Sequence, residues 1–185
     1  MEPACLALRN MLVNDDNEAK AGHAGGVEVL VELVRQHTDM SELMEHACSA
    51  LRNMLVNVDN QTKAGKVGVI EVMVGLVKCH IDQPDLLTST CKVLCNILDK
   101  NKNNQTKAGK VGVVEAMVQI VKHHTKLPKL LKCACLVLQH TMRPNANRCK
   151  LEEAGVEAMS CVILKHRGKP AQYASEVLRQ FALRT

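Results

Sequence analysis

The feature that most constrains how this chain can fold is an internal repeat of about 43 residues. The segment NQTKAGKVGVIEVMV begins at Asn60, NQTKAGKVGVVEAMV begins at Asn104, and the two agree at 13 of 15 positions. A second segment, ACLALRNML at 4–12, returns as ACSALRNML at 47–55 and as TCKVLCNIL at 90–98, with fainter copies from Ala134 and Ala174. Two independent segments with one period indicate an array of stacked structural units.

Each unit of the repeat reads as three helical pieces. A short polar segment, such as 59–65, predicts a first helix of one or two turns. A glycine turn leads into an apolar second helix, for example 69–79, which is apolar on more than one face and should lie between neighbours. A polar break precedes a longer third helix, best represented by 42–56. The third helix has one apolar stripe, formed by Leu43, Ala47, Leu51 and Met54.

These patterns predict an all-α fold with a single array over residues 1–185. A leading third helix at 1–13 precedes four units at 14–57, 58–101, 102–144 and 145–185. The composition favours closely stacked helices, because the chain has no Trp, one Tyr and one Phe, and its core must be aliphatic. The leading helix carries apolar residues that would pack on a preceding helix: Leu6, Leu8, Met11 and Leu12. We therefore expect either a longer array or another chain on this face, which includes a second copy of this one.

The cysteines and the hydropathy pattern bear on the compartment. No apolar run approaches the roughly 18 residues of a membrane span, and the N-terminal residues do not resemble a secretory signal. Nine cysteines without a signal predict free thiols in a reducing compartment, several of them in the core. We expect a cytoplasmic chain, with the nucleus as the alternative, and not a secreted one.

Several functional classes are disfavoured by the motifs. The segment TKAGKVGV lacks the GK-[ST] ending of a phosphate loop and follows a helix instead of a strand. Cys91 and Cys95 share one helix, but no second pair stands at zinc-finger spacing, so we expect core packing and neither metal nor other cofactor. No catalytic signature is present, and we expect neither enzyme activity nor a small-molecule substrate. Nucleic acid is disfavoured because aromatic stacking platforms are nearly absent.

The repeat resembles the armadillo repeat, whose unit has about 40–47 residues and two or three helices. The matching signatures are ALRN in the third helix, the VNDDN and VNVDN that follow it, and AGGV at the turn before the second helix. The resemblance covers essentially the whole chain and fades toward the C-terminus. It implies a right-handed superhelix whose third helices line a concave groove, and a protein-interaction scaffold as the function.

In peptide-binding members of that family, an Asn on the third helix pairs with the backbone of an extended peptide, often with a Trp four residues earlier. Carried over, the Asn positions hold Asn10, Asn53, Asn96, His140 and Gln180. The Trp positions hold Leu6, Ser49, Lys92, Leu136 and Glu176. Because Trp is absent from all of them, an adaptor that reads basic import signals is disfavoured.

Arg9, Arg52 and Lys92 would give such a groove a basic character, which suits an acidic or phosphorylated segment of a partner protein. The candidate groove residues are Asn10, Asn53, Asn96, Arg9, Arg52, Ser49, Lys92 and His140. The alternative is that the asparagines bond to nearby backbone and are architectural, while the arginines are solvated surface charges.

Two other functions compete with the groove. The first is a structural or assembly role through end-to-end self-association of the array, which uses the apolar N-terminal helix. The second is weak binding of RNA or anionic surfaces by a basic ridge on the solvated rim of the first helices. That secondary ridge consists of Lys63, Lys66, Lys107 and Lys110.

Overall fold

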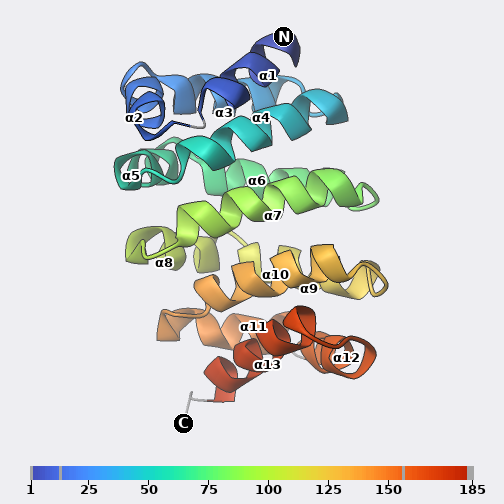
Figure 1. Ribbon diagram of the computed structural model, residues 1–185. Helices are drawn as coiled ribbons and strands as arrows, with labels where there is room; N and C mark the ends of the chain where they lie inside the picture. The colour runs from blue at the N-terminus through green and yellow to red at the C-terminus, as the bar shows by residue number, and fades with distance from the viewer. Residues whose placement is uncertain (1, 13, 156, 183–185) are drawn as a thin grey trace. The chain divides into compact units, whose positions relative to one another are not determined.

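The computed structural model describes residues 2–12, 14–155 and 157–182, and these residues form helices and connecting turns without any strand (Figure 1). The all-α prediction is therefore confirmed for the described chain. The sequence predicts a single array, and the contacts divide the chain into two compact units, Met1–Ile97 and Leu98–Thr185. None of the described helices is long and apolar enough to cross a membrane.

The first unit holds a leading third helix, α1, followed by two complete sets of three helices. The helices are α1 (Glu2–Met11), α2 (Asp15–His23), α3 (Gly26–Gln36), α4 (Ser41–Met54), α5 (Val58–Val67), α6 (Val69–Cys79) and α7 (Pro84–Leu98). Helix α1 packs on α4, and α2 and α3 pack on α5 and α6 of the next repeat. Equivalent helices of successive repeats therefore stack on one another.

The second unit continues the same order of elements. Its helices are α8 (Lys102–Lys110), α9 (Val113–His123), α10 (Pro128–Thr141), the 3-10 turn η1 (Asn145–Asn147), α11 (Arg148–Ala154), α12 (Glu157–Lys165) and α13 (Lys169–Ala182). Here α10 packs on α9 and α13, and α12 packs on α13. The last repeat departs from the others, since η1 and α11 together take the place of a single first helix.

Local sequence signals explain where the short first helix begins and ends. The Oδ1 of Asn57 caps α5 by accepting hydrogen bonds from the backbone N–H of Asp59 at 3.0 Å and of Asn60 at 3.1 Å. Gly68 ends α5 with φ at 91°, a left-handed conformation that glycine adopts without strain, and the next helix starts at once. The glycines at the same place in the other repeats also have positive φ: Gly25, Gly112 and Gly155. The predicted glycine turn is confirmed.

The second and third helices bury the faces that the sequence predicts. Helix α6 has the predicted bounds, 69–79, and buries residues on more than one face. The predicted stripe of the third helix, Leu43, Ala47, Leu51 and Met54, is at most 1% exposed. Helix α4 ends two residues earlier than predicted, because Leu55 already caps it. The core of both units consists of aliphatic residues, Met and Cys, as the composition requires.

Candidate functional site

The third helices α1, α4 and α7 (Figure 1) carry the first three predicted asparagine positions, and the amides of Asn53 and Asn96 are bonded to the preceding repeat. The Nδ2 of Asn53 donates to the carbonyl oxygen of Arg9 at 3.1 Å. The Nδ2 of Asn96 donates to the carbonyl oxygen of Arg52 at 2.7 Å. Asn10 is exposed, and its Nδ2 has no such partner among the described residues. Asn53 and Asn96 therefore join neighbouring third helices 44 positions apart in the sequence, and do not bond to the backbone of the next turn as the architectural alternative predicts.

The side-chain oxygens of Asn10 and Asn53 accept hydrogen bonds from the arginine that precedes each of them. The Oδ1 of Asn53 accepts from Nη2 of Arg52 at 2.9 Å and from its Nε at 3.3 Å. The Oδ1 of Asn10 accepts from Arg9 in the same way, at 3.2 and 3.4 Å. Arg9 and Arg52 are partly exposed residues, and neither pairs with a carboxylate in the described part of the chain. Two arginines one repeat apart are thus held in one orientation with donors to spare, since a guanidinium has five N–H groups.

The other predicted groove residues lie one turn earlier on these helices. Ser49 is partly exposed on α4, and Lys92 is exposed on α7 without an ion-pair partner among the described residues. Toward the N-terminal ends of α4 and α7 the charge reverses. There burial raises the pKa of Glu45, and repulsion from Asp85 raises it further. In α1, α4 and α7 the Arg and Lys residues lie in the C-terminal halves of the helices.

His140, at the fourth of the predicted Asn positions, does not lie on the surface as a groove residue should. It is only 8% exposed, and its Nδ1 is buried without a hydrogen-bond partner. Burial lowers the pKa of this imidazole, and the positive charge of Arg143 lowers it further. A surface role for His140 is not supported by this position. The side chain of Gln180, at the last of the predicted Asn positions, lies outside the described part of the structure.

The secondary basic ridge is only partly exposed. The Nζ of Lys63 lies 2.8 Å from the carboxylate of Glu28 and donates to the carbonyl oxygen of Gly22 at 2.8 Å. This hydrogen bond lowers the pKa of Glu28. Lys63 therefore links two repeats and does not lie on a solvated rim as predicted. Lys66 and Lys110 are exposed, and Lys107 is partly buried. Lys63 and Lys66 belong to the first unit, whereas Lys107 and Lys110 belong to the second.

A second row of asparagines was not predicted as structural. Asn60 is 4% exposed, and its Nδ2 donates to the carbonyl oxygens of Glu18 at 2.9 Å and Met54 at 3.0 Å. Asn147 is equally buried and donates to Gln105 and Thr141 at 2.8 and 2.7 Å. The recurrence of Asn at this place in every repeat was the available signal. A buried polar residue is retained where its hydrogen bonds are made.

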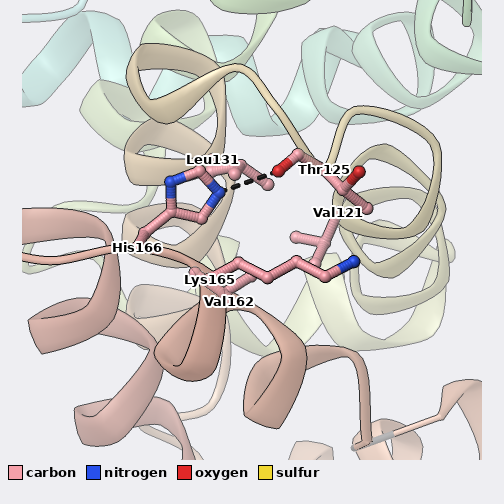
Figure 2. A pocket seen from close by; sticks show the side chains of 6 residues that line it. All are labelled: Val121, Thr125, Leu131, Val162, Lys165 and His166. Carbon is pink, nitrogen blue, oxygen red and sulfur yellow. Dashed lines mark hydrogen bonds between the residues drawn. The ribbon is translucent and has the colours of Figure 1, made fainter.

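Figure 2 shows a small pocket in the second unit, lined by Val121, Thr125, Leu131, Val162, Lys165 and His166. The Nε2 of His166 donates to the carbonyl oxygen of Thr125 at 2.8 Å, which joins two successive repeats. The pocket volume is about 10 Å³, roughly the room that one water molecule needs. It is too small for an organic ligand. Among the described residues no three metal-ligating side chains gather in one place.

Comparison with known proteins gives the fold alone. No known family profile and no curated protein matches the chain. It is similar to three crystal structures of engineered proteins from the Northeast Structural Genomics Consortium, each with a TM-score of 0.86. The sequence identities are 22%, 23% and 23%. The alignments cover 98%, 97% and 98% of this chain, and they cover 72%, 74% and 44% of the respective engineered chains. This likeness supports an all-helical, repeat-like fold.

Proposed function

We propose that the chain is an armadillo-type array, a right-handed superhelix, that acts as a protein-interaction scaffold and binds an extended acidic or phosphorylated segment on α1, α4 and α7. The repeat length and the order of short, buried and long helix agree with that family. The free thiols found for the described cysteines agree with a reducing compartment, the cytoplasm or the nucleus.

The observation that carries this function is a row of cations that pair with no carboxylate among the described residues. Arg9 and Arg52 are oriented by the neighbouring asparagine oxygens, and Lys92 extends the row on α7. Holding a guanidinium in place lowers the ordering cost that a ligand would otherwise meet. A carboxylate or phosphate ligand would form charge-assisted hydrogen bonds with the remaining N–H groups.

In this proposal the asparagines act as positioning residues instead of clamping the backbone of the ligand. One N–H of Asn53 already donates to Arg9, and its oxygen is shared by two arginine nitrogens. Substituting Asn53 would therefore disturb the repeat stack as well as any ligand. Substituting the arginine itself tests binding with less damage to the fold.

The test is fluorescence anisotropy with fluorescein-labelled octaglutamate as the probe. We expect Arg52→Gln to weaken binding about tenfold, because hydrogen bonds to charged groups contribute about 1.5–3 kcal/mol. Arg35→Gln is the matched control. It removes the same charge from α3, where Arg35 donates to the carbonyl oxygen of Val67 and lies near Glu32. Equal affinities of wild type and Arg52→Gln, or equal losses in both variants, would contradict the proposed surface.

Self-association is the second candidate, and the amides of the first repeat favour it. Within the described part of the chain Asn17 donates to Met11 alone, at 2.8 Å, whereas Asn60 also bonds across the repeat boundary. On α1, which forms the N-terminal face of the array, Leu6 is 37% and Met11 62% exposed. A second copy stacked head to tail would offer backbone carbonyls to Asn10 and Asn17, in a contact that can continue into a filament.

Light scattering over a range of protein concentrations tests the head-to-tail contact. We expect the mass to rise with concentration in the wild type and not in Met11→Asp, which places a charge on that face. A constant monomer mass in the wild type would rule this candidate out.

A further inference from the structure

The second unit contains an open cleft of about 510 Å³ between the start of α8 and the turn that follows α10. One wall comes from the turn before α8 and from its first residues, and the other comes from the connection between α10 and η1. The lining residues are Lys100, Lys102, Gln105, Thr106, Arg143, Pro144 and Asn145. The volume falls within the range of about 300–1,000 Å³ that small-ligand sites occupy.

Buried hydrogen bonds fix the two walls with respect to each other. The Nδ2 of Asn147 donates both to Gln105 of α8 and to Thr141 at the end of α10. The Nε2 of Gln105 donates in turn to the carbonyl oxygen of Leu98 at 2.8 Å. Because Gln105 and Asn147 are 2% and 4% exposed, these bonds form in a dry environment. The cleft is therefore a preformed feature of the repeat boundary.

The charge of the cleft is of one sign. Lys100, Lys102 and Arg143 are exposed, none of them pairs with a carboxylate in the described chain, and no acidic residue lines the cleft. Asn145 adds a neutral amide, whereas the hydroxyl of Thr106 already donates to the carbonyl oxygen of Lys102 at 3.0 Å. A second open cleft of about 530 Å³, between α10 and α13, differs in this respect. Its Arg179 is bound by Glu176 at 2.7 Å.

The stacking of repeats does not require these cations. In the preceding repeat Val58 occupies the position of Lys102, and Asp99 occupies that of Arg143. Lys100 lies in a turn that is one residue longer than its counterpart after Leu55, and its φ of 53° is left-handed. Such a conformation is uncommon for a residue with a side chain. The positive charge is thus specific to this cleft and is not part of the repeat pattern.

We propose that this cleft binds a phosphorylated side chain of a peptide. A phosphomonoester carries about −1.5 to −2 charges and three acceptor oxygens, which the three cations and the amide of Asn145 can meet. The guanidinium of Arg143 offers the bidentate contact, and Lys100 and Lys102 act as point charges. A polynucleotide fits less well, because it requires a track of cations with stacking aromatics, and no aromatic residue lines the cleft. The site lies in the second unit and is independent of the function proposed for α1, α4 and α7.

The test uses a heptapeptide with one phosphoserine among alanine and glycine residues, titrated into the full chain labelled with nitrogen-15. We expect amide shifts at 100–106 and 143–145, and none with the unphosphorylated peptide. Arg143→Gln should weaken binding about tenfold or more. Lys102→Val, which installs the residue of the preceding repeat, should weaken it several-fold. The control Lys126→Gln removes an exposed charge of the same unit and should leave the affinity unchanged.

Three results would overturn the proposal. The first is equal binding of the phosphorylated and unphosphorylated peptides. The second is unchanged affinity in both Arg143→Gln and Lys102→Val, whose folding the same spectra report. The third is tighter binding of an oligouridylate that is lost in the same variants, which would make the cleft a nucleic-acid site. Binding of octaglutamate to the first unit would not be affected by any of these results.

Discussion

The buried Asn60 gives the sharpest test of how the repeats are held together. Its Nδ2 joins the carbonyl oxygen of Glu18 in α2 to that of Met54 at the end of α4, so one amide links two repeats. Substitution by alanine removes both hydrogen bonds. Both carbonyls keep a backbone donor, because Glu18 lies within α2 and the N–H of Asn57 donates to Met54 at 3.3 Å.

The expected loss of stability follows from the number of hydrogen bonds that the substitution removes. Two hydrogen bonds at about 1 kcal/mol each give a destabilisation of about 2 kcal/mol for Asn60→Ala. Asn17→Ala is the matched control. Asn17 occupies the same position one repeat earlier, is only partly buried and makes the single bond to Met11, so its loss should be about 1 kcal/mol. Asn60→Asp should be worse than Asn60→Ala, because an oxygen would then face two carbonyl oxygens.

Urea denaturation followed by far-ultraviolet circular dichroism measures these differences. Variants with unchanged m-values report a change in stability alone. If Asn17→Ala and Asn60→Ala lose equal free energy, the bond to Glu18 contributes nothing, and the interpretation of this asparagine as a link between repeats is refuted.

Three further predictions follow from the same structure. Gly109→Ala should destabilise the chain, because the added Cβ would clash with Oδ1 of Asn147. The added Cβ of Gly75→Ala meets nothing within 4 Å on an exposed helix face, so this substitution should stabilise the chain by about 1 kcal/mol. Denaturant midpoints compare the two variants. Burial holds the pKa of His140 in the folded chain below its ordinary value. The contribution of this residue to the free energy of unfolding should therefore be complete above pH 6.5 and should decrease as the pH falls toward the native pKa. His140→Asn should remove this pH dependence. Burial raises the pKa of the Cys48 thiol to about 12, so Ellman's reagent should modify exposed cysteines of the native chain and leave Cys48 unmodified.

The period and the apolar stripes were sufficient to predict most of the fold. The bounds of α6, the glycine turns and the buried face of α4 follow from helical periodicity and from the need for positive φ at Gly68. The two-part first helix of the last repeat was not predicted. There the sequence changes to RPNANRC, and Pro144 precedes η1, so the single capped helix of the other repeats is replaced.

The candidate site was less accessible to sequence reasoning. The pattern placed Asn53 and Asn96 on one face, but it could not tell whether their amides meet a ligand or the preceding helix. That choice depends on the distance between third helices, which only the packing of the repeats sets. The cationic cleft was not predicted from the sequence for a similar reason. Lys102 and Arg143 are 41 positions apart, and the stacking of repeats brings them together.

Part of the identity between the segments that begin at Asn60 and Asn104 has a physical cause. In both α5 and α8 the same four positions are buried, occupied by Asn, Gln, Ala and Gly in that order. Stacking fixes those residues, because a larger side chain would clash and an unpaired amide would be costly. Positions that change between repeats are free of that constraint, and their charges can serve a partner. The replacement of Val58 by Lys102 one repeat later is therefore stronger evidence of binding than the repeated Lys-Ala-Gly-Lys segment.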